Sequence, residues 1–301
     1  MFAFASCWGD CMDIIDLHTH STVSDGTCSP SWLAHLAREN GIAAFALTDH
    51  DNIDGNKIAA SEARDLGVEF IPGMELTTTI DGHKIHVVTL GFEAEHPSFV
   101  KLYKKIRANK ESKMDELIDG IRARGVDITM EKVQEFTDAK VDRYAVMRYM
   151  VALHMTSGIQ PLWDNYLDPV LAELGLGEID PEEAFTAIHE AGGMTSLAHY
   201  HKKIGLKDMT DDEKRSTIRR LHEIGLDGME QWYPSYREPE KAFAAEMIET
   251  LGLVATGGTD YHGFNRPNVS MGTGRNGNMR IPLSALDNVK KKITEYHNKM
   301  K

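Results

Sequence analysis

The stretch Asp16-Leu17-His18-Thr19-His20-Ser21-Thr22-Val23-Ser24-Asp25-Gly26 decides the fold, because it follows the apolar run 12–17 without a break. An apolar run of this length predicts a buried strand. Residues two apart in a strand point to the same side, so His18 and His20 can both reach one cation. The spacing therefore indicates a metal site at the mouth of a strand.

The same arrangement recurs along the chain, with histidines or carboxylates placed at or just past the ends of apolar runs. Asp81-Gly82 predicts a hairpin turn, which places His86 on an antiparallel return strand. The recurrences are Asp49-His50 after the run 42–47, Glu75 after 68–71, His86 within 84–88, His199 after 194–198, and Asp260 with His262 after 253–256. Side chains at strand ends from distant parts of the sequence are expected to meet in one site.

Seven predicted strands, most followed by helices, indicate an α/β protein. Ser29-Pro30 predicts the start of a helix with Trp32, Leu33 and Leu36 on its apolar face. Gly67 is expected to end a helix over 56–66. In a β/α barrel, ligands and catalytic groups lie at the carboxyl ends of the strands. The pattern therefore predicts a TIM-like (β/α)7 barrel.

The βα alternation stops near residue 93 and resumes near residue 181. Charged amphipathic stretches over 99–124 and 143–154 predict helices without strands between them. We expect a barrel formed by 12–92 and 181–285, a helical insertion over 93–180 that covers the site, and terminal segments 1–11 and 286–301.

Composition limits the class of protein. The chain has 301 residues, of which 42% are hydrophobic and 26% charged. These values are expected of a globular protein with a sizeable core. Its net charge of -13 argues against a surface that coats long duplex nucleic acid. No apolar run approaches the roughly 20 residues of a membrane span, and 1–11 lacks a signal-peptide pattern, so we expect a cytoplasmic protein. The three cysteines, Cys7, Cys11 and Cys28, are expected to be incidental thiols.

The residue types indicate the metal. Imidazoles and carboxylates without thiolates suit Zn, Mn or Fe(II). Nine such side chains exceed what one tetrahedral ion can use, so a cluster of two or three divalent ions is expected, with Glu75 as a bridging carboxylate. The alternative is a buried hydrogen-bonded network of histidines and acids.

The chain resembles the PHP (polymerase and histidinol phosphatase) family of metal-dependent phosphoesterases. The resemblance covers 13–92 and 181–275 and rests on His18-Thr19-His20, Asp49-His50, His199 and Asp260-Tyr261-His262, with Glu75 and His86 between them. It implies a distorted seven-stranded barrel and up to three ions. The implied ligand sets are His18, His20, Glu75 and Asp260; Glu75, His86 and His199; and Asp25, His50 and His262.

Two departures from the family pattern concern the loops around the site. His199-Tyr200-His201-Lys202-Lys203 stands where members often have His-Pro-Gly-Arg, and Tyr236 replaces the last residue of Tyr-x-Pro-Ser-His. Asp25 stands where some members with three ions have histidine, which resembles the small-nucleotide phosphatases and exonucleases.

Bound ions can generate a bridging hydroxide and neutralise phosphoryl oxygens, so the implied reaction is phosphate ester hydrolysis. His201 is a candidate general acid or a plain surface histidine. Arg143 matches a family arginine at a helix start and is a candidate phosphate ligand, the alternative being a solvated helix residue. Lys202, Lys203 and Ser235 are further candidates. Trp232 and Tyr233 are candidates for stacking on a base or for the core.

The expected function is hydrolysis of a nucleotide or of a short oligonucleotide end by a metal-dependent phosphoesterase. The partner is then a small phosphorylated substrate, without long duplex nucleic acid or a membrane. An amidohydrolase-like enzyme that cleaves C–N bonds is one alternative, since the same ions can polarise a carbonyl. A metal- or nucleotide-binding accessory module without catalysis is the other.

Overall fold

The computed structural model describes residues 13–137, 140–156, 158–175 and 178–299. The terminal segment 1–11 with Cys7 and Cys11 lies outside the described residues. Within them, no helix is both long enough and apolar enough to pass through a membrane.

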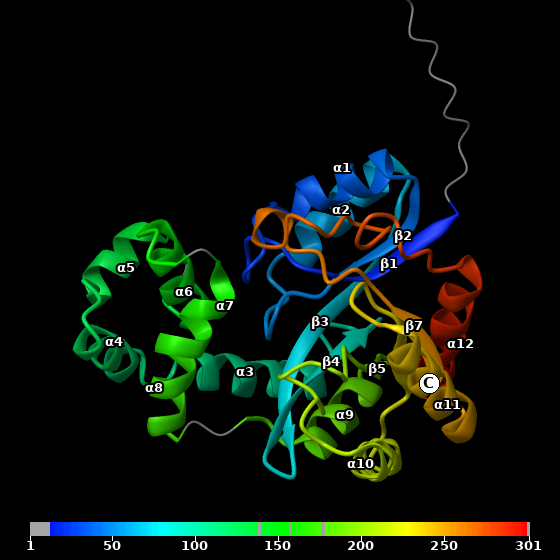
Figure 1. Ribbon diagram of the computed structural model, residues 1–301. Coiled ribbons are helices and arrows are strands. Elements are labelled where there is room, and N and C mark those ends of the chain that lie inside the picture. Colours follow the sequence, from blue (N-terminus) through cyan, green and yellow to red (C-terminus); the bar gives the residue numbers. More distant parts are fainter. Residues whose placement is uncertain (1–12, 138–139, 157, 176–177, 300–301) are drawn as a thin grey trace, which may run out of the picture.

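Seven strands form one sheet in sequence order (Figure 1). β1 to β3 are parallel to one another, as are β5 to β7, and β4 runs antiparallel to both of its neighbours. The strands are β1 (Ile14–Thr19), β2 (Ile42–Leu47), β3 (Glu69–Ile80), β4 (His83–Leu90), β5 (Met194–Leu197), β6 (Gly228–Trp232) and β7 (Val254–Gly257). The predicted α/β class and the seven strands are confirmed.

The hairpin between β3 and β4 turns where the sequence predicts it. Asp81 and Gly82 both have positive φ, 50° and 78°. Two successive positive φ angles are typical of a type I′ turn. The turn sets a register in which Thr77 pairs with His86 and Glu75 with Val88.

The two edge strands approach each other at their carboxyl ends. Thr19 and Tyr261 form a parallel bridge, and the N–H of Asp260 donates to the carbonyl of His18 at 2.8 Å. Gly258 is required here, because a Cβ at this position would lie 2.2 Å from the Cβ of His18. Among the described strands, however, β7 is not paired with β1 in the sheet, so closure into a barrel stays a prediction.

Helices connect and cover the strands: α1 (Pro30–Glu39), α2 (Asn56–Leu66), α9 (Pro181–Glu190), α10 (Asp211–Glu223), α11 (Glu238–Leu251) and α12 (Leu283–Lys299). Ser29 caps α1 by accepting from the N–H of Trp32, and Gly67 ends α2 at φ 69°. Both are typical helix boundaries. Trp32 does not face the core as predicted. It is 50% exposed, and α1 instead buries the smaller side chains Ala34 and Ala37 beside Leu33.

Between β4 and β5 the chain forms helices only: α3 (Pro97–Glu111), α4 (Met114–Ala123), α5 (Met130–Phe136), α6 (Arg143–Ala152), α7 (Ile159–Leu162), a π-helix (Trp163–Leu167) and α8 (Asp168–Glu173). The stretch 99–124 is divided, because Lys113 adopts φ 54° between α3 and α4. Phe99, Leu102 and Ile106 of α3 belong to the core of the sheet region.

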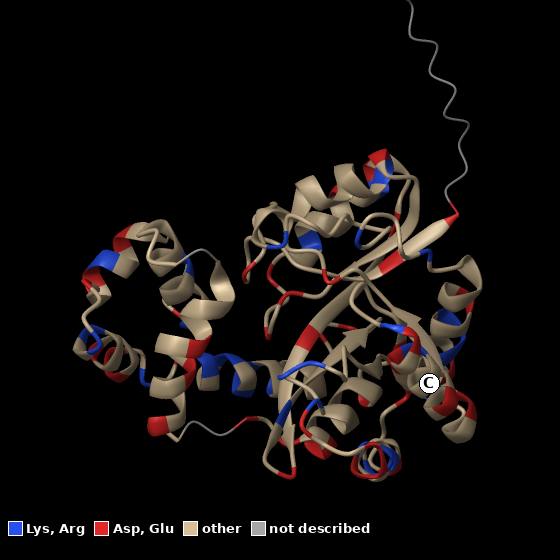
Figure 2. Cartoon of the chain, in the orientation of Figure 1, with Lys and Arg blue, Asp and Glu red and all other residues tan. Residues whose placement is uncertain are grey.

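Helices α4 to α8 contain a hydrophobic core of their own, with Leu117, Ile121, Val146 and Leu167 among its fully buried members. These helices form a group beside the sheet, and α3 connects this group to the sheet (Figure 1). Lys and Arg recur along α3, the helix between the two parts (Figure 2). The predicted domain boundaries stay a prediction.

Candidate metal centre

All nine predicted metal-ligating side chains come together in one cluster: most of them lie at or past the carboxyl ends of parallel strands, whereas Glu75, expected past a strand end, lies within β3 and His86 lies within β4. Each is buried, with at most 8% of its surface exposed. His18 lies in β1 and His20 just past it, Glu75 and His86 lie within the hairpin, and His50, His199, Asp260 and His262 follow strands β2, β5 and β7. Asp25 reaches the cluster from the loop after β1.

One group consists of His18, His20, Glu75 and Asp260. Nε2 of His18 and Nε2 of His20 lie 3.1 Å apart. Oε2 of Glu75 lies 3.3 Å from the first and 3.2 Å from the second, and Oδ1 of Asp260 lies 3.6 Å and 3.2 Å from them. Ligands at about 2.0–2.1 Å from a tetrahedral ion lie about 3.3–3.4 Å apart. The group therefore has the dimensions of a metal site.

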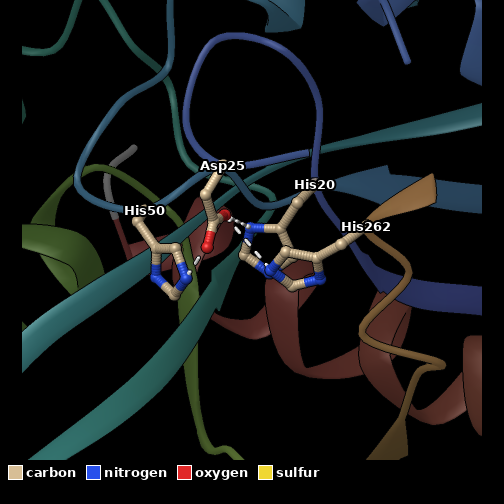
Figure 3. Close-up of side chains that lie close together, drawn as sticks. All are labelled: His20, Asp25, His50 and His262. Atoms are coloured by element: carbon tan, nitrogen blue, oxygen red, sulfur yellow. Dashed lines mark ion pairs between the residues drawn. The ribbon is translucent and has the colours of Figure 1, made fainter. Parts of the chain in front are cut away.

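A second group consists of His20, Asp25, His50 and His262 (Figure 3). Oδ1 of Asp25 lies 3.1 Å from Nε2 of His262, 3.7 Å from Nε2 of His50 and 3.8 Å from Nδ1 of His20. The structure thus adds His20 to the set that the family resemblance implies for this position.

The third group is centred on the Glu75 carboxylate. Oε1 lies 2.9 Å from Nδ1 of His86 and 2.8 Å from Nε2 of His199, and Oε2 lies 2.9 Å from Nδ1 of His50. His50, Glu75 and His86 fall within one cluster of ligand atoms, and His199 contacts it through the Glu75 carboxylate and through the ring of His86. Glu75 takes part in two of the three groups, as a bridging ligand would.

The hydrogen bonding of the cluster leaves ligand atoms free for ions. Among the described residues, six buried atoms of the cluster make no hydrogen bond, and all of them except Nδ1 of His199 lie at ion-pair distance from another ligand atom: Nδ1 of His20, His50, His86 and His199, Nε2 of His262 and Oε2 of Glu75. Buried polar atoms without partners are costly. Imidazole nitrogens and carboxylate oxygens in this arrangement fit Zn, Mn or Fe(II).

The electrostatics favour bound cations. Burial alone would raise the pKa of the Glu75 carboxyl, but the imidazoles of His86, His50 and His18 outweigh it and hold the pKa well below its usual value. Burial lowers the pKa of His199 to about 3, so its imidazole is neutral and can act as a ligand.

The backbone is strained at the same place. His199 and Asp260 adopt positive φ angles of 24° and 53° although neither is glycine. Such conformations persist only where surrounding structure enforces them, and they cluster at functional sites.

Buried carboxylates behind the cluster hold the ligands in place. Glu230 and Asp16 were not predicted for this role, and Asp49 was predicted only as part of the Asp49-His50 motif. Glu230 accepts from Nδ1–H of His18 at 2.7 Å and from the N–H of His199 at 2.6 Å. Asp49 accepts from Ser21 and Ser24 and so fixes the loop that carries Asp25. Asp16 binds Thr259 and Gly272. An acidic residue inside an apolar strand was the available signal.

The insertion supplies three further contacts. The ring of Tyr144 on α6 stacks parallel to His50, with centroids 5.6 Å apart. Lys110 on α3 lies 2.8 Å from Asp51, beside His50, and 3.0 Å from Glu178. Arg148 donates to the carbonyl of Ser24. The insertion is therefore bound directly to the loops that hold the cluster.

A pocket of about 510 Å³ opens beside the cluster. It is lined by the predicted phosphate-binding candidates Arg143, Lys202, Lys203 and Ser235 and by His201, but not by Trp232 or Tyr233. Arg143 is 4% exposed, and its Nε and Nη2 have no hydrogen-bond partner among the described residues. His201 Nε2 and Ser235 Oγ are hydrogen-bonded at 2.8 Å. Lys202 lies 3.4 Å from Asp260, which also binds Arg266, a pocket residue the sequence analysis did not select.

The fold and the site define an α/β protein with a buried histidine and carboxylate cluster at the strand ends, the arrangement of a metalloenzyme centre. The family model named PHP domain matches residues 16–180. The chain is 31% identical to a 5′-3′ exoribonuclease of Haemophilus influenzae, over 82% of this chain and 89% of that protein. The chain belongs to the PHP domain family, as its motifs predict.

Two other relatives resemble the chain in sequence, and a solved structure resembles it in fold. The chain is 28% identical to a phosphoribosyl 1,2-cyclic phosphate 1,2-diphosphodiesterase of Eggerthella lenta, over 83% of this chain and 94% of that protein. It is 27% identical to a 3′,5′-nucleoside bisphosphate phosphatase of Chromobacterium violaceum, over 82% and 87%. The fold matches the structure of a protein from Bifidobacterium adolescentis described as a putative metal-dependent phosphoesterase, with a TM-score of 0.78 at 20% identity over 92% and 96% of the two chains.

Proposed function

We propose that the protein is a metal-dependent phosphoesterase that hydrolyses a phosphate ester of a nucleotide or of a short oligonucleotide end. The observation that carries the proposal is the buried cluster of six imidazoles and three carboxylates, which opens into a pocket lined by lysines and arginines. Membership of the PHP phosphoesterase family supports the same hydrolase class.

Two or three divalent ions, Zn, Mn or Fe(II), would be held by the three groups of ligands. When bound, such ions lower the pKa of water and neutralise the charge that develops on phosphoryl oxygens. We further propose that the approach of β1 and β7 completes a distorted barrel around this site, which the backbone bond between Asp260 and His18 supports.

Arg143 is the residue best placed to bind the substrate. A guanidinium with two unpartnered nitrogens, buried in a pocket beside the cluster, is suited to two parallel bonds to a phosphate. Glu178 lies 3.6 Å from its Nη1 and so leaves Nε and Nη2 directed elsewhere. Lys202 adds positive charge next to Asp260, and the His201–Ser235 pair offers hydrogen bonds to the leaving group.

The substrate class follows from the pocket and from the relatives. The pocket volume of about 510 Å³ falls in the range of sites for small molecules. The relatives are named for RNA, a cyclic phosphate and nucleoside bisphosphates. The net charge of -13 disfavours long duplexes, so we propose small nucleotides or single-stranded ends.

A phosphate-release screen with parallel metal analysis tests the proposal. It should include nucleoside mono- and bisphosphates, 5′-phosphorylated RNA and a panel of amides. We expect release from at least one nucleotide, none in His20→Ala, and full activity in His35→Ala, whose imidazole is on the surface beside Glu62. Hydrolysis of amides alone would instead support the C–N hydrolase, and metal binding without any turnover would support the accessory module.

A further inference from the structure

The pocket has an apolar part that the metal chemistry does not use. Besides its lysines and arginines, it is lined by Ile159, Trp163 and Ile204. A phosphate group gains nothing from contact with an apolar surface, whereas the flat face of a nucleobase packs well on one. The question is which of the aromatic residues near the site is free to receive a base.

Tyr233 is not free. Lys202 lies over its ring with Nζ 4.8 Å from the centroid, and the rings of His199, His201 and Tyr236 lie within 5.6 Å of it. Its hydroxyl donates to Asp260. Trp232 packs against the core cluster that contains Ile15 and Met279, and it does not line the pocket.

Trp163 is positioned by an irregular turn of helix. It begins the π-helix Trp163–Leu167, whose wider turn is uncommon and occurs often at functional sites. Leu162 and Leu167 on either side are buried in the core of the insertion, at 1% and 0% exposure. Trp163 itself packs against that core but is only partly buried, and unlike Trp232 it lines the pocket, together with Gln160 and Asp164.

Trp163 also lies close to the metal centre. The rings of Trp163 and Tyr144 form an edge-to-face contact with the centroids 5.7 Å apart, and Tyr144 stacks on His50 at 5.6 Å. The ring of Tyr144 therefore contacts both Trp163 and His50, a candidate ligand of the ions. A nucleotide whose phosphate lies at the cluster can span this separation with its ribose and place its base on the indole.

We propose that Trp163 is the stacking surface for the nucleobase of the substrate, and that it makes the pocket prefer nucleotides to sugar phosphates. The inference rests on the proposed function for the substrate class. Stacking on an aromatic ring tolerates every base, because each base has a π-face. Trp163 therefore selects for the presence of a base and not for its identity.

Binding of adenosine 5′-monophosphate and of ribose 5-phosphate, measured by calorimetry on the purified full chain, tests this. We expect Trp163→Ala to bind adenosine 5′-monophosphate about 5- to 140-fold more weakly and ribose 5-phosphate unchanged. Trp163→Phe should regain most of the affinity, since it keeps an aromatic face. Trp32→Ala, which removes an exposed tryptophan on α1, is the matched control and should bind as the wild type does.

Unchanged binding of adenosine 5′-monophosphate in Trp163→Ala would overturn the proposal. An equal loss for both ligands would also overturn it, because it would show that Trp163 only supports the packing of the insertion. Calorimetry requires no turnover. If the protein releases phosphate but its binding does not depend on Trp163, only this inference is rejected. If binding depends on the base but no phosphate is released from any substrate, only the proposed function is rejected.

Discussion

Replacing Glu230 by glutamine tests how the protein prepares His18 to bind an ion. The buried carboxylate accepts two hydrogen bonds, from Nδ1–H of His18 and from the backbone N–H of His199. Glutamine offers one acceptor and one donor. The backbone N–H cannot change its role, so the amide oxygen must face His199 and the NH2 group must face His18.

His18 can accept from that NH2 group only if its proton moves from Nδ1 to Nε2. Nε2 is the nitrogen that lies 3.1 Å from Nε2 of His20 and 3.3 Å from Glu75, so the proton would occupy the position of an ion. Loss of such a supporting hydrogen bond lowers metal affinity about 10- to 100-fold. At saturating metal this corresponds to about 1.4–2.7 kcal/mol of lost stabilisation.

The assay is a competition titration of metal-stripped protein against a chelator of known affinity, with urea unfolding of the stripped and loaded forms. Glu230→Gln should lose metal affinity and part of the metal-dependent stability, measured as the difference between its own loaded and stripped forms. Glu249→Gln, an exposed position on α11, is the control and should match the wild type. Metal affinity of Glu230→Gln within twofold of the wild type would refute the reasoning.

Three further predictions follow from the structure. Lys110→Met leaves the buried carboxylate of Asp51 without its ion-pair partner, while Glu178 keeps Lys84 and Arg143 within 4 Å, and should reduce the free energy of unfolding by about 3–5 kcal/mol in urea titrations; a loss below about 1 kcal/mol, typical of a surface pair, would contradict this. Gly258→Ala should lower both stability and metal content, because the added Cβ would meet the backbone of His18, whereas Gly158→Ala has open space and should be neutral. Arg143→Ala should raise KM by about 10- to 100-fold with metal content unchanged, as expected for loss of a charged hydrogen bond; equal kinetics would refute its role.

The candidate ligands at the strand ends could be predicted because the signals for them lie in short stretches of sequence. The pair His18 and His20 has the period of a strand, Asp81-Gly82 has the sequence of a type I′ turn, and Ser29 is a typical helix cap. Each of these features depends on neighbouring residues alone. Parallel strands then bring their carboxyl ends together, so the meeting of the ligands follows from the topology.

Features that depend on contacts between distant segments could not be predicted in the same way. His20 lies between two groups of ligands only because the loop of Asp25 folds back over it. The insertion reaches the site through Tyr144 and Lys110, and no periodicity in its helices indicates which face does so. Trp32 was placed on one apolar face with Leu33 and Leu36, but it is 50% exposed, and α1 buries Ala34 and Ala37 beside Leu33.

The central claim is that phosphate ester hydrolysis depends on two or three divalent ions held by this cluster. The most direct measurement is phosphate release from adenosine 3′,5′-bisphosphate as metal is added stepwise to chelator-stripped protein. We expect no release from the stripped protein and a rate that rises to a plateau at two or three equivalents of metal per chain. Full activity in the stripped protein, or a plateau at one equivalent, would contradict it.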